Sequence, residues 1–291
     1  AFFAEPQALA SSEMLAIAEL DAGEREARIY LAAFFKRKDF ERLFANDIGT
    51  ETQVEWDSRQ KVVVARAIRG FGALVLDERP LRDAPQAALV GAMLTGIREL
   101  GLDALPWSRE LRAWQARVEF LRRSLAERTA DWPAVNDAAL LASLDGWLAP
   151  YLEGITRRDH LVRVDLSAAL HGLLTWKQRE ELERLAPTHL TVPSGSRIAI
   201  NYDGDAPSVA VRLQEVFGLS ATPRIADGGV ALTLKLLSPA GRPVQVTQDL
   251  ASFWARGYLE VRKELKGRYP KHHWPDDPLA ATPTRRVRPR P

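Results

Sequence analysis

The spacing of apolar residues changes twice along this sequence of 291 residues, and that change most constrains how it can fold. Over residues 1–80, and again from His189 onward, runs of β-branched and aromatic residues are typical of strands. Between residues 81 and 186 apolar residues recur every three or four positions, which predicts amphipathic helices. No internal repeat is visible. The two changes of spacing therefore predict two strand-rich parts, one on either side of a helical segment.

The first 80 residues carry the pattern of a small sheet interrupted by one short helix. Strand-like runs are Glu26–Leu31, Thr52–Trp56 and Lys61–Ile68, and a helix is predicted over Lys38–Phe44. Gly70 and Gly72 follow the third run directly, and a glycine inside a strand pattern marks a bulge or a sharp bend. We therefore expect a small curled sheet or barrel in this section.

The middle section, residues 81–186, is predicted to hold several amphipathic helices. One of them begins with Ser108 as its N-cap, because Ser accepts hydrogen bonds from the free N–H groups of a first turn. Its apolar stripe is expected to pack inward and its arginines to face outward, namely Arg112, Arg117, Arg122 and Arg123. Thr175 and Gln178 fit a capping box that starts a further helix.

Strand signals return after the helical segment and give way to a last helix. The expected strands are Arg197–Tyr202, Val230–Leu237 and Val244–Val246, the last two joined by a turn at Ser238–Gly241, and the helix runs from Leu250 to about Arg268. The sequence thus predicts an α+β protein. Its expected parts are a β-rich domain over residues 1–80, a helical segment over 81–186, a C-terminal mixed α/β domain over 187–279, and a loosely ordered basic Pro/Arg tail over 280–291.

Several classes of function are excluded by what the sequence lacks. Cysteine is absent, which excludes disulfides, thiolate metal sites and a cysteine nucleophile, and fits a cytoplasmic location. Neither a glycine-rich phosphate loop followed by Lys and Ser or Thr nor a Gly-x-Ser-x-Gly elbow occurs, so we predict no catalytic residues and no ATPase activity in this chain alone. The longest apolar run, Pro85–Ile97, is shorter than the roughly 20 residues of a membrane span, so no membrane insertion is expected.

One cluster near the end has the residue types of a metal site. Its members are His272, His273, Asp276 and Asp277. The prolines that flank and interrupt them favour an exposed loop over a preorganised cage, so we predict no metal site.

Positive charge at the C-terminus is the strongest local signal. The whole chain carries a net charge of only +2, whereas the stretch from Arg256 onward holds ten basic and four acidic residues, a net charge of +6. Aromatic side chains lie among these cations, a combination that suits single-stranded RNA, namely Tyr258, Tyr269 and Trp274. In the alternative interpretation Trp254, Tyr258 and Trp274 anchor the last helix on the core, and Arg285–Arg290 belong to a solvated tail.

Two stretches near the C-terminus carry a resemblance to a known family. They are Gly241–Trp254, which reads GRPVQVTQDLASFW, and Arg262–Leu279, which reads RKELKGRYPKHHWPDDPL. Both closely resemble the C-terminal end of HrpB proteins, a family of bacterial DEAH-type ATP-dependent RNA helicases. Shorter stretches upstream are similar to the same family, namely Ala18–Asp21, Glu26–Ala33 and Leu105–Ser108.

The resemblance implies that this chain is a C-terminal fragment of such a helicase, preceded in the parent protein by two RecA-like ATPase lobes. ATP and magnesium would be cofactors of the parent, and this chain itself would hold none. Residues 1–80 would be similar to the OB-like domain of DEAH helicases, a small β-barrel. The chain would act as an auxiliary module that binds or guides single-stranded RNA, with the helicase core of the same polypeptide as its partner.

Candidate RNA contacts are basic residues on the barrel loop and near the C-terminus. They are Arg59, Lys61, Arg262, Lys263, Lys266, Arg268 and Lys271. The family stretch contains the last five but assigns none of them an RNA contact. A different function remains open, in which the extension is a protein-docking platform that localises the helicase. Exposed apolar surface would favour docking, and a continuous basic stripe would favour RNA.

Overall fold

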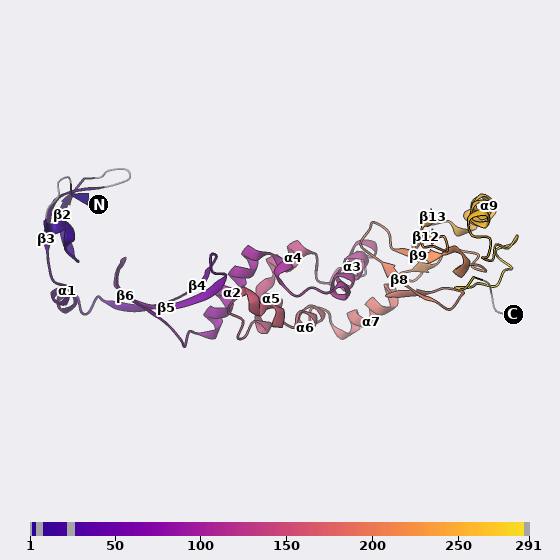
Figure 1. Ribbon diagram of the computed structural model, residues 1–291. Helices are drawn as coiled ribbons and strands as arrows, with labels where there is room; N and C mark the ends of the chain where they lie inside the picture. Colours follow the sequence, from indigo (N-terminus) through magenta and orange to yellow (C-terminus); the bar gives the residue numbers. More distant parts are fainter. Residues whose placement is uncertain (1, 4–7, 22–26, 288–291) are drawn as a thin grey trace. The chain divides into compact units, whose positions relative to one another are not determined.

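The computed structural model describes residues 2–3, 8–21 and 27–287, and it is a mixed α/β structure (Figure 1). The chain divides into two compact units. Residues 1–96 with 156–158 form the first, which we call the N-terminal unit, and residues 97–155 with 159–291 form the C-terminal unit. Each unit is described by itself, and the four part boundaries expected from the sequence remain predictions.

The described residues of the N-terminal unit form two sheets of three strands each. Its elements are β1 (Phe2–Phe3), η1 (Ala8–Ser11), β2 (Leu15–Leu20), β3 (Arg28–Phe34), α1 (Arg37–Leu43), β4 (Gly49–Asp57), β5 (Val62–Phe71), β6 (Leu74–Pro80) and most of α2 (Gln86–Leu100). One sheet has the strand order β1-β3-β2 and the other β4-β5-β6. The short helix and the strand runs predicted for this section are therefore confirmed.

No sheet made by the described strands closes into a barrel, so the expected OB-like barrel is not confirmed. In the second sheet β5 pairs with both neighbours, whereas β4 and β6 each pair only with β5. The glycine signal has a local cause: the β5–β6 register shifts between Arg69 and Gly70, and Gly72 adopts a φ of 54° in the turn. Glycine reaches this left-handed region without a Cβ clash. The two glycines thus make a bulge and a tight hairpin, not a barrel corner.

Helices dominate the first half of the C-terminal unit. They are α3 (Arg109–Ser124), α4 (Asp137–Ala142), α5 (Leu144–Trp147), α6 (Leu166–His171) and α7 (Trp176–Leu185), with short 3-10 turns η2 (Leu102–Ala104), η3 (Ala149–Tyr151) and η4 (Arg158–Arg163). Two predicted helix starts are confirmed. Ser108 Oγ accepts a hydrogen bond from the N–H of Leu111, and Thr175 and Gln178 form a reciprocal capping box at the start of α7.

The expectation that the arginines of α3 all face outward is wrong for Arg117, which is only 5% exposed. Its Nε donates a hydrogen bond to the carbonyl of Ala186 (2.6 Å), and its Nη2 donates one to the carbonyl of Leu182 (3.3 Å). Carbonyls at a helix C-terminus lack partners within the helix. Arg117 therefore caps the end of α7, and Glu183 pairs with the same guanidinium at 2.8 Å.

The second half of the C-terminal unit is built on a five-stranded sheet with the order β13-β12-β9-β8-β7. Its strands are β7 (His189–Thr191), β8 (Arg197–Asn201), β9 (Ser208–Arg212), β12 (Thr233–Leu237) and β13 (Pro243–Thr247), and β10 (Arg224–Ile225) with β11 (Val230–Ala231) forms a separate pair. Strands β9 and β12 run parallel, and the other pairs of the sheet are antiparallel. The predicted β12–β13 hairpin is confirmed, with Ser238 and Gly241 bonded across its turn.

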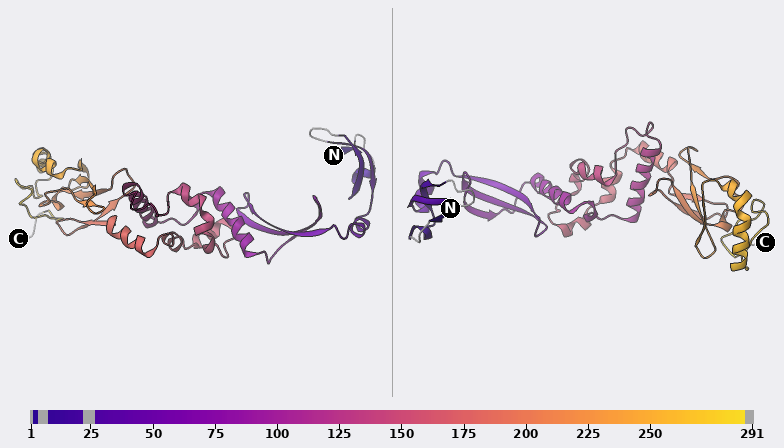
Figure 2. Two further views of the ribbon diagram at one scale, coloured as in Figure 1. Left: turned by 180° about the vertical axis from the view of Figure 1, so that it is seen from behind. Right: turned by 90° about the horizontal axis from the view of Figure 1, so that it is seen from above.

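A continuous helical stretch lies beside this sheet (Figure 2). It consists of α8 (Leu250–Ser252), a π-helical turn η6 (Phe253–Gly257) and α9 (Tyr258–Arg268), and a 3-10 turn η5 (Leu213–Glu215) follows β9. Apolar side chains from both parts form the core, with Phe217 wholly buried and its ring 6.1 Å from that of Tyr258. The helix predicted from Leu250 to Arg268 is confirmed.

Among the residues that the structure describes, no helix is both long enough and apolar enough to cross a membrane.

Candidate nucleic-acid interface

Four of the candidate RNA contacts lie on α9, because the helix runs from Tyr258 to Arg268. The helix buries Tyr258 and Leu265 against the core, which leaves Lys263 and Lys266 exposed. Within the described part of the chain, neither lysine takes part in an ion pair that would offset its charge. Lys271, the fifth candidate near the C-terminus, is exposed just after the helix. The structure therefore brings these five residues together in one segment.

The two arginines of α9 have acidic partners. Arg262 donates from Nε to the carbonyl of Trp274 (3.1 Å) and forms an ion pair with Asp276. Arg268 forms an ion pair with Glu264 one turn earlier, at 3.3 Å. An RNA phosphate would have to compete with these carboxylates, so the lysines are the better placed candidates on this helix.

Arg59 and Lys61 belong to the N-terminal unit, on the turn between β4 and β5, and both are exposed. The carboxylate of Asp57 organises this turn by accepting hydrogen bonds from the N–H groups of Gln60 (2.9 Å) and Arg59 (2.8 Å). These bonds hold the pKa of Asp57 below its ordinary value. The location on a loop is as predicted, and contact with RNA remains a prediction for both residues.

The aromatic residues near the C-terminus anchor the helix on the core, as the alternative interpretation held. Trp254, Tyr258 and Trp274 are 7%, 1% and 7% exposed. Tyr258 donates its hydroxyl hydrogen to the carbonyl of Pro275 (2.9 Å), and burial raises the pKa of that hydroxyl. These three rings are therefore not surfaces on which bases can stack.

The residues of metal-ligand type after α9 are used in other contacts. His272 Nδ1 lies 3.1 Å from Gln214 Oε1, Asp276 pairs with Arg262, and Asp277 accepts hydrogen bonds from the N–H groups that follow it. No group of three or more potential ligands of the His, Cys, Asp or Glu type occurs within residues 2–3, 8–21 and 27–287.

The sequence analysis missed one exposed cation, Arg212 at the end of β9, which lies close to the segment that follows α9. Burial and the nearby charge of Arg212 lower the pKa of His272. Arg285 and Arg286, assigned to a solvated tail in one interpretation, follow a residue that bonds to η5: the N–H of Thr284 donates to the carbonyl of Gln214 (2.9 Å). No local pattern marks Arg212, because a charged residue at a strand end is ordinary.

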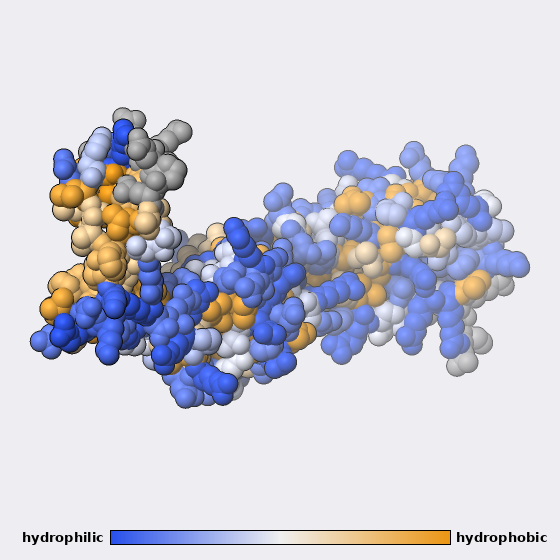
Figure 3. Space-filling view, turned by 60° about the vertical axis from the view of Figure 1, so that its left-hand side comes forward, coloured by the Kyte–Doolittle hydropathy of each residue, from blue (hydrophilic) through white to orange (hydrophobic). Residues whose placement is uncertain are grey.

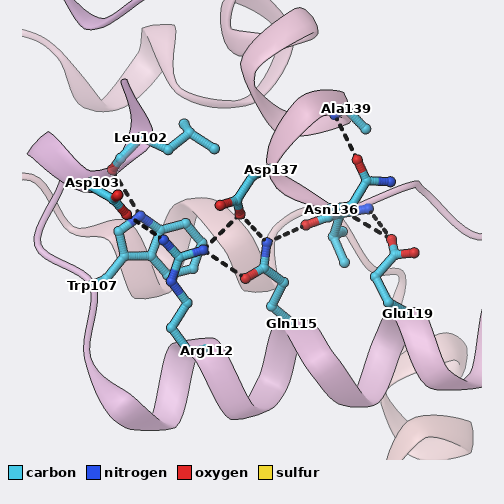
Figure 4. Close-up of polar contacts among 10 residues, drawn as sticks. Leu102, Asp103, Trp107, Arg112, Gln115, Glu119, Asn136, Asp137 and Ala139 are labelled. Carbon is cyan, nitrogen blue, oxygen red and sulfur yellow. Dashed lines mark hydrogen bonds and ion pairs between the residues drawn. The ribbon is translucent and has the colours of Figure 1, made fainter. Parts of the chain in front are cut away.

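The family stretch Leu105–Ser108 has a structural role, shown in Figure 4. The guanidinium of Arg112 lies over the Trp107 ring, 3.8 Å from its centroid, and hydrogen-bonds to Asp103 (2.8 Å) and Asp137 (2.7 Å). Gln115 adds a hydrogen bond to the same Asp137 carboxylate (2.7 Å). This network joins α3 to η2 and to the start of α4.

An apolar groove of about 620 Å³ lies within the N-terminal unit, between β2, α1 and the β5–β6 hairpin. Its lining is mostly apolar and aromatic, namely Met14, Leu15, Ala16, Phe35, Phe40, Leu43, Phe44, Phe71 and Leu74, with Glu13 and Asp39 at the edge. Leu43 is 72% exposed and Phe34, on the neighbouring β3, is 62% exposed. Figure 3 shows apolar residues gathered on the surface of this unit. Patches of this kind mark interaction surfaces.

Two family models match separate parts of this chain. Residues 147–278 match the model described as ATP-dependent helicase C-terminal, and residues 47–81 match the connector region of ATP-dependent RNA helicase HrpB. These matches include the β4–β5 turn in the N-terminal unit and α9 in the C-terminal unit.

Known proteins give the same result. The chain is 44% identical over 264 residues to the ATP-dependent RNA helicase HrpB of Escherichia coli K12, which covers 90% of the chain and 32% of that protein. Two crystal structures described as E. coli HrpB, a DExH-box NTPase and a DEAH/RHA helicase, match with TM-scores of 0.68 and 0.59 at 43% and 39% identity; they cover 96% and 94% of this chain and 35% and 34% of theirs. The chain thus spans about a third of these relatives, and it corresponds to the C-terminal region of HrpB.

Proposed function

We propose that this chain is the auxiliary C-terminal region of an ATP-dependent RNA helicase, and that its C-terminal unit holds or guides single-stranded RNA. One observation carries this proposal: the C-terminal unit presents exposed cations, such as Lys263 and Lys266, that have no acidic partner in the described part of the chain. Such cations suit a phosphate backbone. ATP and magnesium would act in the ATPase lobes of the parent protein.

The division of labour follows from the chemistry of each part. Hydrolysis in the ATPase lobes would move the strand, and a charged surface outside the lobes would keep hold of it between steps. Contacts to phosphates position a nucleic acid without reading its sequence. The auxiliary region would therefore raise the affinity for RNA with little effect on sequence preference.

The test is fluorescence anisotropy with a labelled single-stranded RNA at several salt concentrations. Each neutralised phosphate of a single strand contributes roughly −0.7 to the slope of log affinity against log salt. Replacing Lys263, Lys266 and Lys271 together by Ala should flatten that slope by about 2. An unchanged slope in a variant that melts like the parent would remove α9 from the RNA path. Binding that does not depend on salt in the parent chain would contradict the proposed function itself.

A second candidate function is protein docking, and the apolar groove of the N-terminal unit favours it. We propose the helicase core of the same polypeptide as the occupant, since the relatives extend well beyond the part that this chain matches. Burying exposed leucine and phenylalanine side chains would supply about 25 cal/mol per Å² of apolar area.

Substitution of Leu43 tests this docking in the full-length protein that contains the chain. Leu43 is 72% exposed, so Leu43→Glu should leave the melting temperature of the isolated chain unchanged and lower that of the full-length protein. Leu259→Glu is the matched control, because Leu259 is 60% exposed on α9 in the other unit. Equal effects of the two substitutions on the full-length protein would argue against the groove.

A further inference from the structure

The last described residues fold back over the turn η5, and one buried side chain holds them there. Gln214, only 3% exposed, donates from Nε2 to the carbonyl of His273 (2.9 Å), and its Oε1 lies 3.1 Å from His272 Nδ1. Its backbone carbonyl accepts a hydrogen bond from the N–H of Thr284 (2.9 Å). We call residues 269–287 the fold-back segment.

A further backbone bond closes the fold-back segment on itself, since the N–H of His273 donates to the carbonyl of Val287 (3.0 Å). One residue separates Arg212 from Gln214, and Arg285 and Arg286 follow directly on Thr284. The hydrogen bonds of Gln214 therefore fix these three arginines around one end of the five-stranded sheet, where β9 finishes.

The charge at this end of the sheet is not compensated. Arg212, Arg285 and Arg286 are exposed, and none of them forms an ion pair with another described residue. The acids nearby in the chain are committed elsewhere. Glu215 is 6% exposed and accepts a hydrogen bond from Ser194, Asp276 pairs with Arg262, and Asp277 accepts backbone N–H groups within its own turn.

The lowered pKa of His272 agrees with this arrangement. Burial comes first among its causes, and the charge of Arg212 comes second. A neighbouring cation disfavours the protonated imidazole. Arg212 therefore lies close enough to His272 to disfavour the protonation of its imidazole.

We propose that Arg212, Arg285 and Arg286 form a phosphate-binding cluster for the backbone of single-stranded RNA. The proposal rests on the proposed function, in which the C-terminal unit contacts RNA. Guanidinium groups present forked N–H donors that match phosphate oxygens. The hydrogen bonds of Gln214 hold the backbone that carries these three side chains, so the guanidinium groups can reach successive phosphates of one strand.

The surface of α9 is a weaker place for the same ligand. Its lysines share that surface with Glu260 and Glu264, and Arg268 is already paired with Glu264. Carboxylates beside a phosphate path repel the RNA. The acids nearest to the cluster in the sequence already have partners: Glu215 bonds to Ser194, Asp276 pairs with Arg262, and Asp277 accepts from backbone N–H groups.

The experiment compares two triple substitutions that remove the same charge from the same unit. The test variant is Arg212→Gln with Arg285→Gln and Arg286→Gln, and the control variant is Arg109→Gln with Arg163→Gln and Lys177→Gln, three exposed cations of the helical part that are not candidate RNA contacts. Gln keeps much of the aliphatic stem, and all six residues are exposed. Anisotropy of a labelled single-stranded RNA across salt concentrations measures the slope for each protein, and a thermal melt checks that each is folded.

The test variant is expected to flatten the slope of log affinity against log salt by about 2, and the control variant to leave most of it. The cluster is refuted if only the control variant flattens the slope, or if both flatten it equally; the RNA-binding function then stands. If the parent chain itself shows no salt-dependent binding of RNA, both the proposed function and the phosphate-binding cluster are refuted. Should the triple variant melt early, Arg212→Gln alone must still flatten the slope by about 0.7.

Discussion

The indole ring of Trp56 lies against the backbone of Gly96, so closely that a Cβ at position 96 would come within 2.5 Å of the ring atom Cδ2. Trp56 belongs to β4 and Gly96 to α2, so this contact fastens the β4–β5 hairpin to the helix. Glycine inside a helix costs about 1 kcal/mol relative to alanine. The space taken by the ring explains why glycine stands here.

Gly96→Ala is therefore expected to lower the free energy of unfolding by about 1–3 kcal/mol, because the methyl group forces the ring or the helix to shift. Gly91→Ala is the matched control on the same helix, exposed and with no atom within 4 Å of the added Cβ. It should raise the free energy of unfolding by up to about 1 kcal/mol. Urea unfolding followed by tryptophan fluorescence measures both, and a gain for both variants would contradict the tight contact.

Arg117→Leu is expected to destabilise the chain by about 2 kcal/mol, since it removes the side-chain donor of the Ala186 carbonyl and one of the two donors of the Leu182 carbonyl, the other being the N–H of Ala186. Arg123→Leu, on the same helix but exposed, removes the same charge and should change stability by less than about 1 kcal/mol. Urea denaturation midpoints compare the two. Similar shifts for both variants would mean that Arg117 does not cap α7.

Asp227 receives hydrogen bonds from Arg128 (3.1 Å) and from Arg184, which hold the pKa of its carboxyl below the ordinary value. Because the folded state releases this proton more readily than the unfolded chain, the stabilisation is complete above the unfolded pKa of about 4 and is lost as the pH falls through the folded pKa. Asp227→Asn should lower the melting temperature at neutral pH and make it less sensitive to acid.

Melting temperatures between pH 3 and 7 test this dependence on Asp227. Asp205→Asn is the control, because Asp205 is exposed and has no ion pair with another described residue. A parent chain and an Asp227→Asn variant that lose stability in parallel below pH 4 would show that these ion pairs contribute nothing to acid sensitivity.

Arg112→Lys is expected to cost about 1–2 kcal/mol of stability, although the charge is kept, because lysine has neither the flat face that covers Trp107 nor the fork that reaches two carboxylates. Arg109→Lys, an exposed position on the same helix, should be neutral. Chemical denaturation curves of the two variants decide between a planar contact and a simple ion pair, which lysine would replace without loss.

Local signals allowed most of the helices and strands to be predicted. Ser108 and the pair Thr175 and Gln178 mark helix starts through hydrogen bonds made within three residues, so the sequence carries them directly. The hairpin turn at Ser238–Gly241 is of the same kind. Each of these features is made by residues close together in the sequence. Apolar periodicity and turn-forming residues report such local contacts, so the features could be predicted.

Contacts between residues far apart in the sequence could not be predicted from these local patterns. Arg117 was expected on the surface because its helical face carries other arginines, yet its partners lie more than 60 residues further along the chain. The barrel was expected from the strand runs and the glycines. Closure of a sheet into a barrel depends on which strands pair with each other, and the residue pattern along a single strand does not specify its pairing partners. Arg212 joins the cationic surface for the same reason, through the bonds of Gln214 to the fold-back segment.

The family match in the C-terminal unit ends at residue 278, whereas the fold-back segment contributes backbone bonds as far as Val287. Boundaries taken from the match alone would cut through a buried part of the unit, since Thr284 is only 7% exposed. A protein truncated there would lose the hydrogen bond from Thr284 to Gln214 and, at the same time, four arginines, namely Arg285, Arg286, Arg288 and Arg290. Weak RNA binding by the truncated protein could then come from a damaged fold or from the lost charge. Point substitutions of the arginines keep the fold-back segment in place and therefore separate these two effects.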